Sequence, residues 1–351
     1  LFLRKYNPCG NELWSFEMNS DLPLSLTHLN IDSNQNILLS GRYDEFNQNP
    51  RAYLIKVNTF GTVLFSKIYE TSSAANSNIY SVSVTSEGDY LMYGLYDFTL
   101  VSPDNRKMFV SKIDTNGVVQ WLRLYDFTSF GFGPITTTKD KGAIVKNSNI
   151  LFKIDSVGEI KWAKKFNRLG DVSNSIETDS GYVFFGYTIG AIDRSNAYLV
   201  KPDGSIGWET NTFLFGSDFY PQAGIQRKNG NLLYTGSYQF GINKSIFVEL
   251  DPKNGAIQRF EELNTTGFFS IDLIEDSKGN ILFTGADDRW IVSNLLCGKL
   301  NDTLSTVSCL NSNLTHPGLP FSLIELEDMT IGSSLNTDFT DNILNITATT
   351  L

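Results

Sequence analysis

Short apolar runs alternate with polar turns along nearly the whole chain of 351 residues. Residues 52–55 (Ala-Tyr-Leu-Ile) and residues 197–200 (Ala-Tyr-Leu-Val) are typical of these runs, which are rich in β-branched and aromatic side chains. Runs this short, bounded by Asp, Asn and Gly, favour strands over helices. The pattern therefore predicts an all-β protein built from hairpins.

One phrase recurs seven times along the chain. It consists of a basic residue, an apolar residue, Asp or Asn, a short turn with Gly, and a Trp after that Gly, as in the copy from Lys112 to Trp121. The copies begin at positions 5, 56, 112, 153, 201, 249 and 299, at intervals of 41 to 56 residues, and the sixth has drifted to Glu249. Gly supplies the positive φ that such a turn needs. A strand-rich repeat of this period predicts a β-propeller.

A second hairpin lies between successive phrases. Its later strand ends in Gly in most copies, at Gly41, Gly94, Gly186, Gly236 and Gly285. Two hairpins make one four-stranded antiparallel blade, with strands a, b, c and d from the inside of the ring outward.

The two ends of the chain predict the number of blades. Residues 1–16 form a c–d hairpin with no a–b pair before it, and residues 322–332 fall in register as one more a–b pair, because Gly332 lies 47 residues after Gly285. We therefore expect a seven-bladed propeller over residues 1–337, closed by pairing of these two segments, which would hide exposed sheet edges. The alternative is six blades plus a cap.

Residues 338–351 form a tail beyond the expected ring. Leu344 and Ile346 alternate with polar residues, and Leu351 ends the chain, which is the pattern of a half-buried strand. Such a strand either packs on its own propeller or adds to a sheet edge of a neighbouring copy, which would link chains head to tail into a filament.

Three segments carry a resemblance to a known repeat family. Residues 52–56, 110–121 and 197–201 are similar to the secreted β-propeller repeats of the type "YLVKxDxxGxxxW", near the SBBP and PQQ-like families of bacterial and protist surface proteins. The resemblance covers roughly residues 1–335 and implies a propeller fold. It implies no particular activity, because these repeats are scaffolding.

Charge and hydropathy argue against two classes of partner. The net charge is −10 and the pI is about 4.8, whereas nucleic-acid binding needs clustered Lys and Arg. The longest apolar stretch, residues 182–192, is broken by Gly and is too short to span a bilayer. We expect no nucleic-acid partner and no membrane insertion.

Sequons and cysteines favour an extracellular or cell-surface protein. Cys297 and Cys309 are placed symmetrically about Thr303, as cross-strand partners of a disulfide would be. Cys9 is the one remaining cysteine. The alternative is three reduced cysteines in a cytosolic protein. Each of the five Asn-x-Ser/Thr glycosylation sequons falls in an expected loop, turn or tail: Asn243, Asn264, Asn301, Asn313 and Asn345.

The sequence contains no recognisable catalytic constellation. His28 and His316 are its two histidines, and no nucleophile elbow, zinc motif or phosphate-binding loop occurs. We therefore expect no catalytic residues, no metal, no cofactor and no enzyme activity. Carboxylates after the b strands leave a glycosidase or lyase as an alternative, although solvated loop side chains explain them more simply: Asp97, Asp193, Asp287 and Asp288.

Longer loops join strands b to c and d to a, on the face that we call the top. Aromatic side chains beside acids over a central channel are suited to binding sugar or peptide. The candidate binding residues on this face are Tyr43, Asp97, Tyr187, Tyr238, Asp287 and Asp288.

These observations lead to one functional prediction with two alternatives. We expect a secreted, glycosylated, non-enzymatic propeller with a structural or adhesive role, self-associating through its C-terminal strand. The first alternative is a carbohydrate- or peptide-binding module that uses the top face. The second is a carboxylate-based glycosidase or lyase.

Overall fold

The structure is a computed structural model of the chain. It describes residues 2–6, 12–19, 24–45, 48–71, 76–96, 107–126, 133–166, 169–188, 194–212, 219–238, 244–263, 268–287, 295–301, 303–304, 311–313, 326–328, 333–335, 339–343 and 347–350. Every regular element in these ranges is a β-strand, so the all-β prediction is confirmed. No helix in the described ranges has the length and hydropathy that a membrane span requires.

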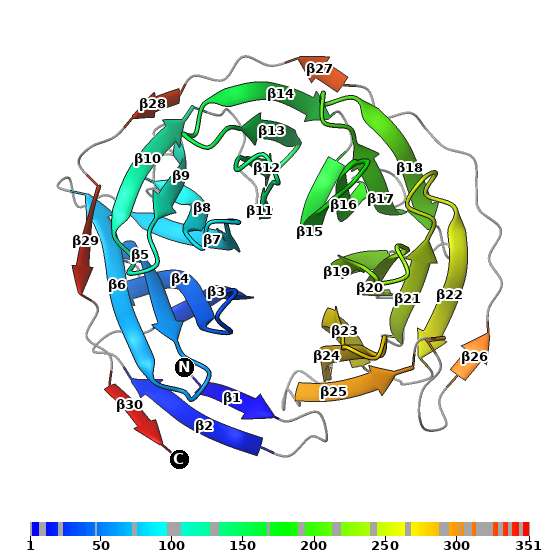
Figure 1. Cartoon of the computed structure of the whole chain (residues 1–351), viewed down its shortest axis with the longest axis horizontal. Helices are drawn as coiled ribbons and strands as arrows, with labels where there is room; N and C mark the ends of the chain where they lie inside the picture. The colour runs from blue at the N-terminus through cyan, green and yellow to red at the C-terminus, as the bar shows by residue number, and fades with distance from the viewer. Residues whose placement is uncertain are drawn as a thin grey trace.

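The strands form radial antiparallel sheets around a central channel (Figure 1). One of the six sheets in this ring contains three described strands, β23 (Phe268–Glu275), β24 (Ile281–Asp287) and β25 (Leu295–Leu300). The other five sheets each contain four consecutive strands: β3 (Leu24–Ile31), β4 (Ile37–Glu45), β5 (Gln48–Val57), β6 (Val63–Thr71); β7 (Ser77–Val84), β8 (Tyr90–Tyr96), β9 (Lys107–Ile113), β10 (Val119–Tyr125); β11 (Ile135–Thr137), β12 (Ala143–Asn147), β13 (Ile150–Ile154), β14 (Ile160–Phe166); β15 (Leu169–Thr178), β16 (Gly181–Thr188), β17 (Arg194–Val200), β18 (Ile206–Thr212); β19 (Phe219–Gln226), β20 (Leu232–Tyr238), β21 (Lys244–Leu250), β22 (Ile257–Leu263).

The fold is a six-bladed β-propeller. The first strand of each blade, β3, β7, β11, β15, β19 or β23, lines the channel, and the later strands follow outward in chain order (Figure 1). The predicted propeller of antiparallel blades is thus confirmed, with six blades, the alternative count, in place of seven. The N-terminal hairpin of β1 (Phe2–Tyr6) and β2 (Glu12–Asn19) forms as predicted but lies at the rim without an inner pair among the described residues.

The segment expected to complete the N-terminal blade lies elsewhere, which corrects the predicted closure. Its described part, β27 (Leu326–Asp328), pairs with the outer edge of β14, and Lys165 there lies opposite Glu327. In the predicted register Asp328 would take the place of Ile281, which is fully buried at the start of β24, and burying a carboxylate there would be costly. Opposite charges across an outer strand pair are favourable instead.

The C-terminal part of the chain runs back around the outside of the ring (Figure 1). β26 (Asn311–Asn313) pairs with β22, β28 (Ser333–Leu335) with β10, β29 (Phe339–Ile343) with β6, and β30 (Thr347–Thr350) with β2. The described strands of the tail, β29 and β30, therefore pair within the chain, whereas the expected self-association through this strand stays a prediction. They cover outer edges that would otherwise expose unpaired N–H and C=O groups.

In the described part of the chain the hydrophobic core forms six clusters, and each lies between two consecutive sheets. Between the β23–β25 sheet and the β1–β2 hairpin, no such cluster occurs in the described part of the chain. Inner strands are in contact around the ring, as β3 is with β7 and β19 with β23, but β3 and β23 make no comparable contact. Apolar residues on these two strands, such as Leu29 and Ile274, are accordingly exposed. We call this junction the break in the ring.

The Trp and Gly of the repeat phrase form a contact between blades. The indole N–H of Trp162, on β14, donates a hydrogen bond of 2.9 Å to the carbonyl oxygen of Pro202 in the next blade's c–d turn. Gly204 in that turn has φ +87°, and a Cβ there would lie 3.1 Å from the Trp162 ring. The same pairing joins Trp208 to the turn that contains Gly255. The phrase therefore fixes one blade against the next as well as forming a hairpin.

Candidate ligand-binding site

Four of the six residues predicted for a top-face site fall within the described ranges, and three of these have only their backbone described, so the top-face site stays a prediction. Tyr43 lies in β4, half-buried, and packs against the core cluster between the N-terminal hairpin and the first blade. Tyr187 in β16, Tyr238 in β20 and Asp287 in β24 have described backbones only. Asp97, Asp193 and Asp288 lie outside the described residues.

Most positions predicted for covalent chemistry and assembly also lie outside the described residues. Asn301 follows β25, and its side-chain oxygen accepts a hydrogen bond of 3.0 Å from the Thr303 amide, while Asn313 lies in β26. Cys297 lies in β25, opposite Thr284. Outside the described ranges are Asn243, Asn264, Asn345, Cys9, Cys309, Leu344, Ile346 and Leu351.

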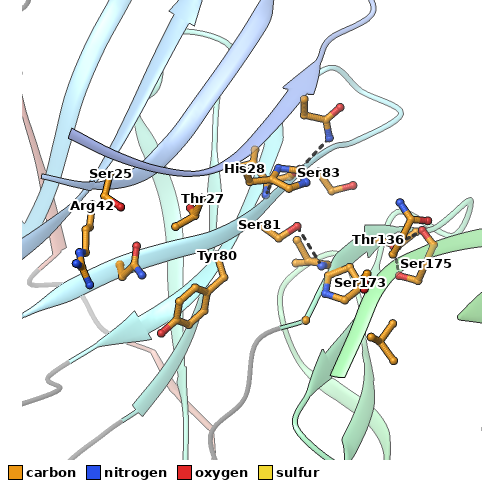
Figure 2. Close-up of a pocket in the computed structure, with 18 residues that line it drawn as sticks. Ser25, Thr27, His28, Arg42, Tyr80, Ser81, Ser83, Thr136, Ser173 and Ser175 are labelled. Atoms are coloured by element: carbon orange, nitrogen blue, oxygen red, sulfur yellow. Dashed lines mark hydrogen bonds between the residues drawn. The ribbon is translucent and has the colours of Figure 1, made fainter. Parts of the chain in front are cut away.

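A cavity of about 630 Å³ opens in the wall of the channel, and we call it the channel groove (Figure 2). Its lining comes from the inner parts of four consecutive blades, those that begin with β3, β7, β11 and β15. The lining residues are Ser25, Thr27, His28, Asn30, Arg42, Asn78, Tyr80, Ser81, Val82, Ser83, Gly133, Pro134, Ile135, Thr136, Val172, Ser173, Asn174 and Ser175.

Side-chain hydroxyls join the inner strands of neighbouring blades at this groove. The Thr27 hydroxyl on β3 donates to the Ile79 carbonyl on β7, and Ser173 on β15 donates to the Pro221 carbonyl on β19 at 2.6 Å. The hydroxyls of Thr136 and Ser175 lie 2.6 Å apart. Blades have no shared backbone ladder, so small polar side chains on the inner strands supply hydrogen bonds between them. The hydroxyl hydrogens of Thr27 and Ser173 are used in this way, and their lone pairs remain as acceptors.

His28 is held as a neutral side chain in the groove. Its Nδ1 accepts a hydrogen bond of 3.3 Å from the Val82 amide, which leaves the proton on Nε2. Burial lowers the pKa of His28 to about 4, because the charged imidazolium would lose solvation. Near neutral pH the ring is therefore a hydrogen-bond donor through Nε2.

Two asparagines that line the groove have a side-chain oxygen without a hydrogen-bond partner in the described structure. The Oδ1 atoms of Asn78 on β7 and Asn174 on β15 are buried, and neither accepts a hydrogen bond within the described structure. The Asn78 residue is only 5% exposed. A buried acceptor left unsatisfied costs about 1–3 kcal/mol, but a molecule in the groove would reach these oxygens only if the asparagine side chains turned toward it.

The charge of the groove is low. Arg42 is the one charged side chain among the described lining residues, and it lies with Ser25 and Tyr80 at the end of the groove shown at the left of Figure 2. Ser173 and Ser175 lie at the opposite end. In the described ranges, no group of three His, Cys, Asp or Glu side chains is placed to hold a metal ion.

The sequence contains a signal for the groove that the top-face prediction did not use. Ser81 and Ser83 alternate on one inner strand, and Ser173 and Ser175 on another, whereas the b and c strands of the same blades are apolar. Small polar residues at period two on channel-lining strands indicate a polar wall.

The chain is weakly similar to two solved structures. No family model and no curated protein matches the chain, so the repeat-family resemblance stays a prediction. A putative 6-phosphogluconolactonase from Bacteroides uniformis is similar in structure, with a TM-score of 0.47 and 11% identity over 93% of this chain and 98% of the other. The tail fiber of Staphylococcus aureus phage P68 has a TM-score of 0.29 and 6% identity over 84% and 96%. Likenesses this weak carry no argument about function, so a proposal has to rest on the channel groove.

Proposed function

We propose that the chain is an extracellular recognition protein, in which the propeller is a non-enzymatic scaffold and the channel groove binds a small polar ligand. The observation that supports this most directly is the groove of about 630 Å³, whose polar lining comes from four consecutive blades. Ligand sites usually have volumes of about 300–1,000 Å³ and a few convergent polar groups.

The hydrogen-bonding pattern of the groove favours binding over catalysis. The Nδ1 atom of His28, which a general base would use, already accepts the Val82 amide. The lowered pKa of His28 also makes this ring a poor base near neutral pH. A site of this kind is compatible with the adhesive role expected from the sequence, and the sequons and cysteines support an extracellular location.

The test is saturation-transfer NMR of the full chain against a library of sugars, amino acids, nucleosides and organic acids. Ser25 lines the groove and is exposed, so Ser25→Trp should fill one end of it. Ser156 is exposed in a c–d turn away from the groove, and Ser156→Trp is the matched control. We expect at least one class of ligand to bind the wild type and the control but not Ser25→Trp.

Two outcomes would contradict the proposal. If no library member binds, or if binding is equal in the two tryptophan variants, the groove is not a ligand site. If a bound molecule is converted by the wild type and not by Ser25→Trp, the groove is a catalytic site and the non-enzymatic part of the proposal is wrong.

A further inference from the structure

We infer that the break in the ring is a docking site for a β-hairpin of a partner protein, which adds to the free edge of β1 and brings an acidic turn residue to Lys5. The site uses the face of β3 that points away from the channel groove, so the inference goes beyond the proposed function and does not depend on it.

The first wall of the break is an apolar face of β3. Leu29 lies opposite Leu39 on β4, and Leu39 belongs to the core cluster that the first blade shares with the β1–β2 hairpin. Residues opposite each other on adjacent strands share a face of the sheet, so Leu29 points to the side of this hairpin. By the same register, Leu26 and Ile31 lie on that face too. Asn30, which lines the channel groove, bonds to the next blade on the other face.

The second wall comes from β23. Counted back from the first residue of the a–b turn, Ile271 and Ile274 correspond to Thr27 and Asn30 of the first blade. Thr27 and Asn30 donate hydrogen bonds to backbone carbonyls of the next inner strand, β7. Ile271 and Ile274 therefore point to where a next inner strand would lie, and the described ranges hold none at that position.

The two walls together form an exposed apolar surface. Their five large side chains are between 39% and 57% exposed, and they are half of the ten exposed large apolar side chains in the described part of the chain: Leu26, Leu29, Ile31, Ile271 and Ile274. Exposed apolar side chains that gather in one place are typical of an interaction site, whereas single ones are ordinary.

The free edge of β1 defines the fold of the occupant. Of the described strands, only β2 pairs with β1, so the inner edge of β1 presents unpaired N–H and C=O groups at the rim between the β3–β6 and β23–β25 sheets (Figure 1). In the first complete blade, two strands, β3 and β4, lie inside the corresponding c strand, β5. A two-stranded hairpin that pairs with β1 by strand addition therefore matches the vacant positions.

Lys5 specifies the charge of the hairpin turn. Lys5 and Lys56 occupy the same position of the repeat phrase, and each donates a hydrogen bond to a threonine carbonyl in the next blade's c–d turn, Thr59 and Thr115 respectively. Lys56 also pairs with Asp32, at the start of its own blade's a–b turn, at 3.3 Å. Among the described residues no carboxylate pairs with Lys5. An acid at the start of the incoming turn would supply that contact.

The occupant is assigned to a partner because the hairpins of the chain itself are in use wherever they are described. Each described a–b hairpin lies inside its own blade, and the described tail strands pair with outer edges. A second copy of the chain could supply one of these hairpins only by opening a blade. A partner protein with an unpaired hairpin has no such barrier.

The experiment uses a hairpin of known charge as the probe. A cyclised peptide with the sequence of residues 24–45 contains Asp32, the partner of Lys56, and cyclisation holds a hairpin that is marginally stable alone. Fluorescence anisotropy measures its affinity for the full chain and for three variants. Leu29→Glu and Ile274→Glu alter the two walls, and Leu64→Glu alters an exposed leucine of the outer strand β6 as the matched control.

We expect the peptide to bind the wild type and Leu64→Glu with the same affinity. Leu29→Glu and Ile274→Glu should each bind at least about tenfold more weakly, because the bound hairpin would bury an unpaired carboxylate. Amide hydrogen exchange gives a second readout. The amides of β1 that point away from β2 should exchange more slowly when the peptide is bound, because strand addition pairs them.

A charge exchange tests the assignment of Lys5. The peptide with Asp32→Lys should bind the wild type at least about tenfold more weakly, because like charges would face each other. Lys5→Glu should restore the affinity of this altered peptide, which a purely structural role of Lys5 would not do. Equal affinity of the two peptides for the wild type would overturn the acidic turn.

Three results would overturn the docking site itself. If the peptide does not bind, or binds Leu29→Glu and Leu64→Glu equally, the break does not take a hairpin. If the full chain sediments as a dimer that Leu29→Glu dissociates, a second copy occupies the break in place of a partner. If the inward-pointing amides of β1 are already protected in the free monomer, the chain itself covers the break.

Discussion

Arg227 and Glu249 form a buried ion pair in which the Arg227 guanidinium lies 3.0 Å from the Glu249 carboxylate, with the two side chains 3% and 5% exposed. Glu249 occupies the position of the basic residue in the repeat phrase. In the first four-stranded blade, Lys56 holds that position and pairs with Asp32 at 3.3 Å, and Asp32 begins the a–b turn just as Arg227 does. The apparent drift at Glu249 is therefore an exchange of charges that preserves the contact.

We predict that this exchange appears in a double-mutant cycle. Arg227→Asp or Glu249→Lys alone leaves like charges facing each other in a buried site, and each should lower the free energy of unfolding by about 3–5 kcal/mol. The double variant restores an opposite pair in the orientation of the first blade, so its loss should be smaller than the sum of the two single losses. Urea denaturation measures all four proteins.

Additive losses would contradict this account. They would indicate that each position is specific for one sign of charge because of its neighbours. Glu275 lies 3.4 Å from the Arg227 Nε, and the Asn231 side chain donates a hydrogen bond to Glu249.

We predict that Gly204→Ala is more destabilising than Gly230→Ala. The φ angles are +87° and +91°, so both alanines pay the same strain of about 1–2 kcal/mol. A Cβ at Gly204 would also meet the Trp162 ring and the Lys164 side chain, whereas nothing lies within 4 Å of one at Gly230. Thermal unfolding of the two variants isolates the contact between blades, and equal losses would mean that the Trp–Gly packing contributes nothing.

The break in the ring predicts different responses from two leucines on adjacent strands. Leu29 on β3 is 45% exposed, and Leu38 on β4 is 1% exposed within a core cluster. Leu29→Ala should change stability by no more than about 0.5 kcal/mol, and Leu38→Ala should cost about 2–5 kcal/mol. Chemical denaturation tests this directly. Comparable losses at both positions would show that a further inner hairpin covers β3 in the folded protein.

The position of the tail predicts the effect of its removal. If β29 and β30 cover the outer edges of β6 and β2 in the same chain, the full chain sediments as a monomer, and deletion of residues 339–351 increases association through the uncovered edges. The self-association predicted from the sequence gives the reverse result, with an oligomeric full chain and a monomeric truncation. Sedimentation velocity at several concentrations separates the two.

Much of the fold could be predicted from the sequence because its signals are local. The turn from Asp114 to Gly117, with two Asp114 side-chain hydrogen bonds and a Gly at φ +77°, is specified by adjacent residues. The partner of Trp162 could not be predicted, since Pro202 lies 40 residues away in another blade. The blade count failed for a related reason. The position of Gly332 gave a spacing, but spacing alone did not account for the cost of burying Asp328 in an inner hairpin.

The channel groove was not predicted, because the residue types that line it are common in strands. Aromatic and acidic loop residues such as Tyr43 drew attention, yet Tyr43 packs against the core. Ser81 and Ser175 are common residue types in strands, and their meeting in one groove depends on the ring geometry. The sequence gives no partner for His28, because its contact with Val82 crosses from one blade to the next.

We predict that His28 makes stability depend on pH in a defined window. Its pKa falls from an ordinary 6.5 to about 4 on folding, because burial disfavours the charged ring. The unfolded chain therefore takes up the proton first as the pH falls, so the contribution is complete above pH 6.5 and is lost by about pH 4. The shift corresponds to at most about 3 kcal/mol. Urea denaturation at closely spaced pH values should show a smaller decline for His28→Gln than for the wild type. Parallel curves for the two proteins across this window would mean that His28 titrates normally in the folded state, and the groove would then carry a positive charge at mildly acidic pH.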